Sequence, residues 1–247
     1  MAIKTTLNYS PNFNPIKRSA KKIKFIIFHY TGMEKESDTI NRLTNIQSKV
    51  SSHYLIKNNG EIVRLVPDLY IAWHAGESSW KNYKSLNQNS IGIEITNPGH
   101  QHGYKKFTAK QIFSILRLSK FLIEKYKIKS KNILGHSDVA PHRKKDPGEK
   151  FPWEYLSNNK IGIWHTLNKQ DLTKNRKIKI SKIEENIFFR NLFKIGYSKT
   201  YLKDSNKNKY LRELAKTFQR RFRQELVDGK IDQECLIISK NLIKAYN

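Results

Sequence analysis

Residues Ile23 to Gly32 consist of Ile-Lys-Phe-Ile-Ile-Phe-His-Tyr-Thr-Gly. The compact apolar run at the start of this stretch predicts a buried strand, and the glycine at its end breaks that strand. A second stretch, Ile91 to Ile95, is Ile-Gly-Ile-Glu-Ile. It predicts another strand, in which Gly92 indicates a close backbone approach. Each strand carries one side chain that could do chemistry, His29 in the first and Glu94 in the second.

The segments around these two strands alternate between strand and helix patterns. The predicted elements are a helix over 37–50, two strands over 53–56 and 61–66 that are joined by an Asn-Gly hairpin turn, a helix that follows the capping box Thr108-x-x-Gln111, and a short strand over 133–135. An irregular stretch with three prolines follows over 137–153. This alternation predicts one α/β domain with a mixed central β-sheet flanked by helices.

The last third of the chain has a different composition. Residues 168–182 are polar and rich in lysine, which predicts a linker, and the remainder shows helical periodicity. We therefore expect a catalytic domain over 1–167, the linker over 168–182 and a small, basic, helical domain over 183–247.

The charge of the chain is strongly positive. The 47 basic and 21 acidic residues among 247 give a formal net charge of +26. Such a field attracts polyanions, of which nucleic acid, anionic membrane surfaces and anionic cell-wall material are the candidates. The sequence contains no P-loop and no aromatic signature of RNA binding, so we expect no nucleic-acid partner.

Cysteine content and hydropathy bear on the compartment. Cys235 is the only cysteine, so no intrachain disulfide can form. The first ten residues lack the apolar core of a secretory signal, and no run of about 18 apolar residues could span a membrane. We expect a soluble chain that lies in the periplasm or cell envelope if a signal was removed or another export route is used, with the cytoplasm as the alternative.

Three residues could form an open metal site. His29, His136 and Asp146 each lie where a predicted strand ends or a loop begins, so their side chains can meet at one edge of the sheet. Two imidazoles and one carboxylate suit a catalytic zinc ion that keeps its fourth position for water. Bound zinc lowers the pKa of that water to about 7. Spacing alone leaves open the alternative that these are unrelated loop residues.

Five short motifs occur in a fixed order along the chain. They are Phe28-His29-Tyr30-Thr31, Ala72-Trp73-His74-Ala75-Gly76, Asn89-Ser90-Ile91-Gly92-Ile93-Glu94, Gly135-His136-Ser137-Asp138-Val139-Ala140-Pro141 and Lys144-Lys145-Asp146-Pro147-Gly148. Together they resemble the N-acetylmuramoyl-L-alanine amidases of the type that includes the phage lysozyme-amidase and the peptidoglycan recognition proteins. The resemblance is nearest to the bacterial AmiD-like enzymes and covers roughly residues 20–165.

The resemblance implies a role for each matching residue. It places His29, His136 and Asp146 on the ligands of one Zn²⁺ per chain, Glu94 on the catalytic glutamate and Lys144 on a lysine that stabilises the oxyanion. Burial on an apolar strand would raise the pKa of a glutamate toward the range of a general base. The implied activity is hydrolysis of the amide between N-acetylmuramic acid and L-alanine, in peptidoglycan or in muropeptides including 1,6-anhydro forms.

Several alternatives stay open at this stage. A non-catalytic recognition protein on the same fold would bind peptidoglycan without cleaving it, although the complete ligand set argues against this. Some members of the family use a tyrosine where this chain has Ser52. Trp73 and His74 are predicted to line the substrate groove, but His74 could equally pack beside Trp73. Asp138 could orient a ligand imidazole, and a turn-forming role fits it better.

The C-terminal part carries a weaker resemblance. The segments Phe218-Gln219-Arg220-Arg221-Phe222-Arg223 and Asp228-Gly229-Lys230-Ile231-Asp232 resemble the three-helix peptidoglycan-binding module found at the end of AmiD-like enzymes. A plain structural appendage is the alternative, because amphipathic helices with a basic face are common.

Overall fold

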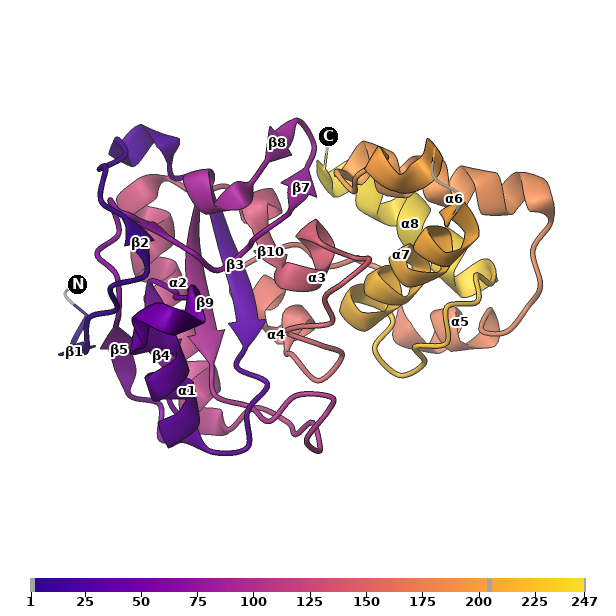
Figure 1. The fold of residues 1–247 in the computed structure, drawn as a ribbon. Coiled ribbons are helices and arrows are strands. Elements are labelled where there is room, and N and C mark those ends of the chain that lie inside the picture. The colour runs from indigo at the N-terminus through magenta and orange to yellow at the C-terminus, as the bar shows by residue number, and fades with distance from the viewer. Residues whose placement is uncertain (1–2, 204–205, 247) are drawn as a thin grey trace.

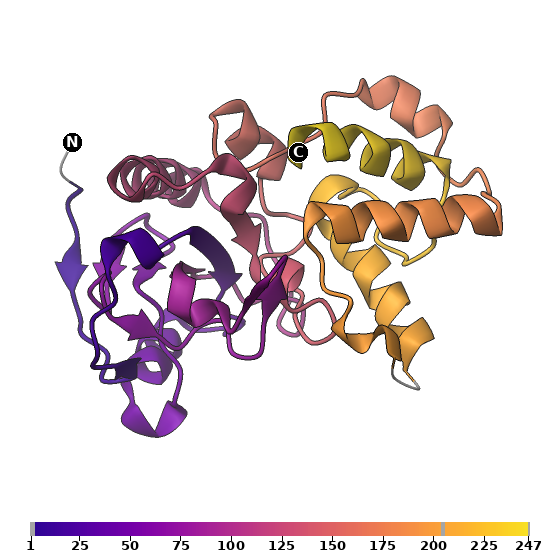
Figure 2. The ribbon, with the colours of Figure 1, turned by 90° about the horizontal axis from the view of Figure 1, so that it is seen from above.

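The computed structural model describes residues 3–203 and 206–246. A six-stranded sheet with its flanking helices forms one part of the molecule, and helices from the last third of the chain form the other (Figure 1). Seen from above, the helical part lies to one side of the part that contains the sheet (Figure 2).

The central sheet is mixed, which confirms the predicted fold class. Its strands follow the order β1-β5-β4-β9-β3-β10. Only β4 and β5 pair antiparallel, and the other neighbours are parallel. The strands are β1 (Thr6–Leu7), β3 (Phe25–Tyr30), β4 (Tyr54–Ile56), β5 (Ile62–Arg64), β9 (Ser90–Ile95) and β10 (Ile133–Gly135).

The two strands that the sequence marks most strongly lie side by side in this sheet. β3 and β9 pair over six residues, and the register sets His29 opposite Glu94. β10 pairs with the other edge of β3, with Gly135 opposite Phe28. Because parallel strands end at the same edge, this pairing carries the chain from Gly135 into His136 directly beside the end of β3.

The helices on the sheet agree with the pattern in outline. The predicted capping box of Thr108 and Gln111 is present at the start of α2 (Ala109–Tyr126), which buries an apolar face against the sheet. The helix predicted over 37–50 is shorter: α1 (Glu36–Thr44) stops before Asn45, and η2 (Ile46–Ser48) follows. The reason is local, since the Asn45 side chain accepts a hydrogen bond from the Gln47 N–H and starts a new turn.

Some short elements give no sequence pattern. Two pairs of two-residue strands were not predicted, because two residues are too few to show a periodicity. These are β2 (Phe13–Asn14) with β6 (Ile71–Ala72), and β7 (Ser79–Trp80) with β8 (Tyr83–Lys84). The stretch predicted as irregular over 137–153 overlaps the short helix α3 (His136–Val139) at its start and α4 (Trp153–Asn158) at its end. The other one-turn helices among the described residues are η1 (Ala20–Lys22), η3 (Leu86–Asn89), η4 (Ser130–Asn132) and η5 (Thr200–Lys203).

In the described residues of the C-terminal part, the α-helices are α5 (Lys169–Lys174), α6 (Lys182–Ile195), α7 (Lys207–Phe222) and α8 (Gln233–Tyr246). The segment 168–182, predicted as a linker, contains α5 and is packed rather than extended. Its Leu172 is buried in the apolar cluster of these helices, and its Lys179 forms a β-bridge with Asp232.

The helical part and the sheet share one apolar core. A single cluster contains Phe25 and Leu134 from the sheet together with Phe188, Leu192 and Phe218 from the helices. This is the arrangement expected of parts that are stabilised jointly. Within the described residues, no helix is both long and apolar enough to cross a membrane.

Candidate active site

The three predicted metal ligands meet at one edge of the sheet. His29 lies near the end of β3, His136 begins α3 directly after β10, and Asp146 lies in the loop that follows. The Nδ1 atoms of the two histidines are 2.9 Å apart, and Asp146 Oδ2 lies 3.1 Å from the first and 2.9 Å from the second. All three side chains are buried.

The donor set fits a metal ion. His136 Nε2 lies 3.2 Å from the carbonyl oxygen of Ala75, which can only accept, so this nitrogen carries the proton and Nδ1 presents a lone pair. That lone pair faces the Asp146 carboxylate, which is itself an acceptor. A cation between the three atoms resolves this repulsion. Ligand atoms around tetrahedral zinc lie about 3.3 Å apart, given bonds of about 2.0–2.1 Å, so the observed separations need only a small expansion.

The electrostatics favour the metal-binding forms of His29 and Asp146. Burial, together with the neighbouring His136, lowers the pKa of His29 to about 4. Burial alone would raise the pKa of Asp146, but interactions with His136 and His29 outweigh that effect and lower it. A neutral imidazole and an ionised carboxylate are the protonation states that ligate a metal.

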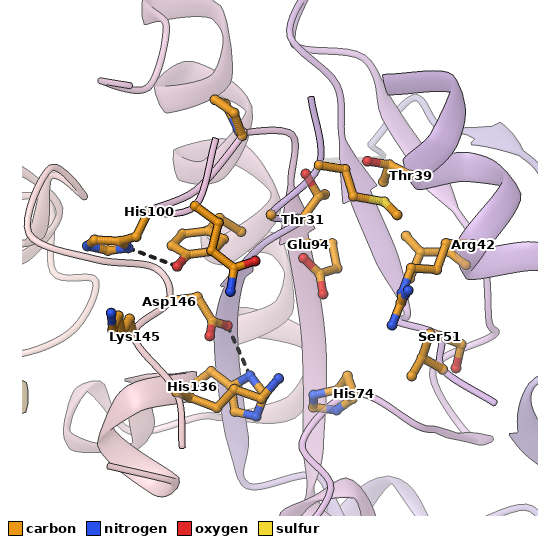
Figure 3. Close-up of a pocket in the computed structure, with 18 of the residues that line it drawn as sticks. Thr31, Thr39, Arg42, Ser51, His74, Glu94, His100, His136, Lys145 and Asp146 are labelled. Atoms are coloured by element: carbon orange, nitrogen blue, oxygen red, sulfur yellow. Dashed lines mark hydrogen bonds and ion pairs between the residues drawn. The ribbon is translucent and has the colours of Figure 1, made fainter. Parts of the chain in front are cut away.

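Glu94 lines the same cleft as His136 and Asp146 (Figure 3). Its Oε2 atom is buried and has no hydrogen-bond partner among the described residues. The pKa of Glu94 is raised to about 8, mainly by burial. The charge of Asp146 acts in the same direction, and those of Lys144 and Arg42 act against it. A carboxylate with a raised pKa and an unused oxygen is suited to proton transfer.

The cleft has a volume of about 470 Å³. Four basic side chains line it, from Arg42, Arg143, Lys144 and Lys145. The charge on Lys144 acts on both Glu94 and His29, which places it within electrostatic reach of the proposed chemistry. Of the residues predicted here, Trp73 also lines the cleft, with 37% of its surface exposed.

The structure gives His74 a further set of contacts that the sequence did not indicate. His74 lines the cleft, but its ring packs edge-on against His29 and His53. Its Nδ1 lies 3.0 Å from His29 Nε2, and its Nε2 lies 3.1 Å from the Ser90 hydroxyl. Ser90 was not predicted as a site residue, because a serine at the start of a strand has no distinctive pattern.

Asp138 and Ser52 have structural roles. Asp138 accepts hydrogen bonds from the Gly135 N–H and the Tyr197 hydroxyl and pairs with Arg221, all inside the protein. It therefore shapes the turn before His136 rather than contacting the imidazole. The Ser52 hydroxyl donates a hydrogen bond to the backbone oxygen of Tyr54 in β4, at 2.8 Å.

A second polar group at the cleft was also missed. The Tyr30 hydroxyl lies 2.8 Å from His100 Nδ1, and His100 Nε2 lies 3.0 Å from Glu149. Tyr30 and His100 both line the cleft. A loop histidine gives no indication of such a contact, because Glu149 is 49 residues away in sequence.

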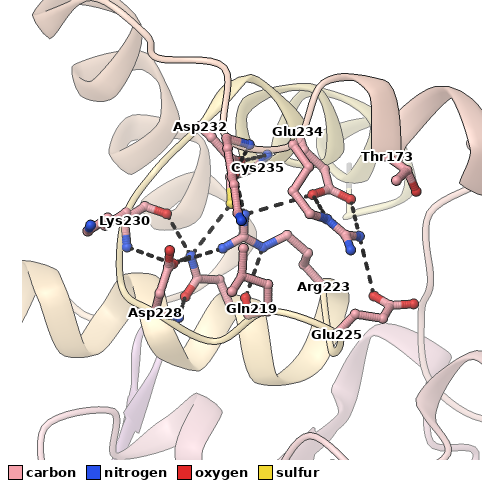
Figure 4. A network of polar contacts seen from close by, with 12 residues as sticks. Thr173, Gln219, Arg223, Glu225, Asp228, Lys230, Asp232, Glu234 and Cys235 are labelled. Atoms are coloured by element: carbon pink, nitrogen blue, oxygen red, sulfur yellow. Dashed lines mark hydrogen bonds and ion pairs between the residues drawn. The ribbon is translucent and has the colours of Figure 1, made fainter.

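The conspicuous polar residues of the C-terminal motif contact one another (Figure 4). Gln219 donates to Asp228, and the buried Arg223 pairs with Asp228, Asp232 and Glu234. The Asp-Gly-x-x-Asp loop is thus held by its own helices, and these carboxylates are already occupied within the protein.

Comparison with known proteins gives a consistent result. Residues 19–149 match the family model described as N-acetylmuramoyl-L-alanine amidase. The chain is 34% identical over 237 residues to the N-acetylmuramoyl-L-alanine amidase AmiD of Escherichia coli, a match that covers 91% of this chain and 84% of the relative. It is 41% identical over 116 residues to the 1,6-anhydro-N-acetylmuramyl-L-alanine amidase AmpD of Haemophilus influenzae, covering 46% of this chain and 61% of that one.

Solved structures agree with the sequence comparison. The AmiD structure from E. coli, in complex with anhydro-N-acetylmuramic acid-L-Ala-D-γ-Glu-L-Lys, superposes with a TM-score of 0.79 at 32% identity and covers 94% of this chain and 93% of its own. AmpDh3 from Pseudomonas aeruginosa, in complex with an anhydromuramic pentapeptide, gives a TM-score of 0.78 at 29% identity and covers 94% of each chain. Both similarities extend over the sheet and the C-terminal helices.

Proposed function

Because the chain belongs to the N-acetylmuramoyl-L-alanine amidase family, we propose that it uses one Zn²⁺ to hydrolyse the amide bond between N-acetylmuramic acid and L-alanine. The observation that carries this proposal is the convergence of His29, His136 and Asp146, two of which line a cleft together with Glu94. Two nitrogens and one oxygen with an open fourth position are the donor set of catalytic zinc sites. When bound there, Zn²⁺ supplies Lewis-acid polarisation and lowers the pKa of water.

In this proposal the chain's own residues move the protons and hold the charge. Glu94 takes a proton from the attacking water and delivers it to the amine of the departing L-alanine. Its position opposite His29 on the neighbouring strand keeps the carboxylate within the cleft. Lys144, whose positive charge acts on Glu94, stabilises the negative oxygen of the tetrahedral intermediate. Trp73, which lines the cleft with part of its surface exposed, contacts the substrate.

Removal of the metal provides the first test. We expect a chelator to abolish hydrolysis and added Zn²⁺ to restore it, with the products of both states measured by mass spectrometry. Intact sacculi and 1,6-anhydro-muropeptides should be compared as substrates. The released peptide must begin with L-alanine, and a product cut at any other bond would contradict the proposed specificity. Preference for sacculi would assign the enzyme to the periplasm or cell envelope, and preference for fragments would favour recycling in the cytoplasm.

The basic lining of the cleft predicts how an acidic peptide stem is recognised. Arg42 projects from α1 toward the cleft (Figure 3), and its side chain forms no hydrogen bond or ion pair with any residue in the described part of the chain. We infer that it binds a carboxylate of the stem peptide. A hydrogen bond to a charged group contributes about 1.5–3 kcal/mol, which corresponds to about a tenfold or larger change in affinity.

We therefore expect Arg42→Gln to raise KM at least about tenfold and to leave kcat little changed. The matched control is Arg117→Gln, since Arg117 is an exposed arginine of α2 that does not line this cleft. Steady-state kinetics on a muropeptide with free stem carboxylates and on its amidated counterpart would check the assignment. Equal losses on both substrates would show that Arg42 does not bind a carboxylate.

A further inference from the structure

A chain of hydrogen bonds extends from His29 away from the metal side of its ring. His29 Nε2 lies 3.0 Å from His74 Nδ1, and His74 Nε2 lies 3.1 Å from Ser90 Oγ. The Ser90 hydroxyl in turn lies 2.6 Å from the backbone oxygen of Leu86. The side chains of His29, His74 and Ser90 are buried, which limits competition from water for these hydrogen bonds.

The last acceptor determines the direction of every bond in the chain. The carbonyl of Leu86 can only accept, so Ser90 donates its single proton to it. Ser90 Oγ then accepts from His74, which fixes the proton of His74 on Nε2. The lone pair of His74 is therefore on Nδ1, and it accepts from Nε2 of His29. A neutral His29 in this state has its free lone pair on Nδ1, the atom that faces His136 and Asp146.

Gly92 provides the space for the middle of this chain. A Cβ atom at position 92 would lie 2.4 Å from Cγ of His74, closer than any carbon contact allows. The predicted close approach at this glycine is thus made by the ring of His74 rather than by another backbone. The Gly92 N–H donates to Nδ1 of the buried His53 at 3.0 Å, which holds the strand in place beside the ring.

We propose that Ser90 and His74 are positioning residues that fix the tautomer and the ring orientation of His29, so that its Nδ1 atom is presented to the metal. This inference rests on the metal site of the proposed function. It replaces substrate contact as the main role of His74. Partners that orient a ligand histidine typically affect metal affinity by about 10–100-fold, and here the partner is another imidazole whose own proton is set by a hydroxyl.

Two variants of matched shape test the proposal. Asn and Leu are nearly isosteric, but Asn can place an amide oxygen near the site of His74 Nδ1 and Leu cannot. We expect His74→Leu to weaken Zn²⁺ binding by about 10–100-fold, and His74→Asn to stay much closer to the native protein. Affinity should be measured by competition with a metal-binding dye, and KM on the native substrate should change little in the Asn variant. Equal affinities for the two variants would overturn the proposal.

Ser90→Ala tests the far end of the chain without touching either imidazole. It frees the proton of His74 to move to Nδ1, so we expect Zn²⁺ binding to weaken by about tenfold, with recovery in Ser90→Thr. Circular dichroism of the metal-free proteins shows whether each variant is folded. A native Zn²⁺ affinity in Ser90→Ala would contradict the proposed role of these hydrogen bonds.

Nitrogen NMR of the metal-free native protein reads the tautomers directly and separates the two proposals. We expect a proton on Nε2 of both His29 and His74. If the native protein has these tautomers but binds no metal, the proposed function is refuted, and Ser90 and His74 still fix the tautomer of His29. If the protein binds metal but the histidines have the opposite tautomers, only the proposed role of Ser90 and His74 is refuted.

Discussion

Replacement of Glu94 by glutamine should reduce kcat by about 10²–10⁴-fold, the usual contribution of a general base. Glutamine has the same shape but cannot accept the proton from water or pass it to the departing amine. Because Glu94 is not a metal ligand, we expect Zn²⁺ affinity to stay native. By contrast, His29→Ala should lose both metal and activity, since it removes one of the three ligands.

The pH profile gives an independent reading of the same residue. A general base acts only when it is ionised, so kcat/KM should fall as the pH drops below the pKa of Glu94. Burial and Asp146 raise that pKa to about 8 in the metal-free protein. Bound Zn²⁺ adds positive charge nearby and lowers it, so the acid limb of the active enzyme should lie below pH 8.

The control for this prediction is Glu124→Gln, which alters an exposed glutamate of α2 and should leave kcat and the profile unchanged. Residual turnover of Glu94→Gln should lack the acid limb attributed to Glu94. A Glu94→Gln enzyme with a kcat near that of the native protein would refute the assignment of the base. If Glu94→Gln has a reduced kcat but keeps the acid limb of the pH profile, that limb belongs to the titration of another group.

His29, Glu94 and His136, which the sequence predicted as site residues, lie on, or directly after, neighbouring parallel strands of the sheet. His29 and Glu94 lie on strands whose apolar runs are long enough to be recognised, and parallel pairing then brings their ends to one edge. His136 follows a third strand in the same sheet. Once strand ends and sheet edge are known, the meeting of these side chains follows from the geometry of a parallel sheet.

The parts that the sequence did not predict depend on contacts between distant segments. Ser90 acts through His74, and His74 reaches His29 across 45 residues, so no local pattern marks the pair. The packed state of 168–182 has a similar origin, because its helix is stabilised by Leu172 entering a core built from α6 to α8. A polar composition describes the exposed face of such a segment and not the few apolar residues, Leu172 and Ile180, that anchor it.

The shared core of the two parts explains why the C-terminal helices affect the site. Arg221 on α7 pairs with Asp138 on α3, donates to the backbone oxygen of Ile133 and lies over the ring of Trp153. Asp138 in turn accepts the N–H of Gly135, the residue before His136. The ion pair therefore joins α7 to the turn that positions His136.

We expect Arg221→Met to lower the free energy of unfolding by about 3–5 kcal/mol, because it leaves Asp138 as an uncompensated buried charge. Methionine retains much of the packing volume, so the loss reports mainly on the charge. The double variant Asp138→Asn/Arg221→Met removes both charges and should recover a large part of that stability. Denaturant unfolding gives the free energy of unfolding of the native protein, of Arg221→Met and of the double variant. The matched control is Arg190→Met, which replaces an exposed arginine of α6. If Arg221→Met lost no more stability than this control, the helical part would be an appendage whose charge pairing does not support the turn before His136.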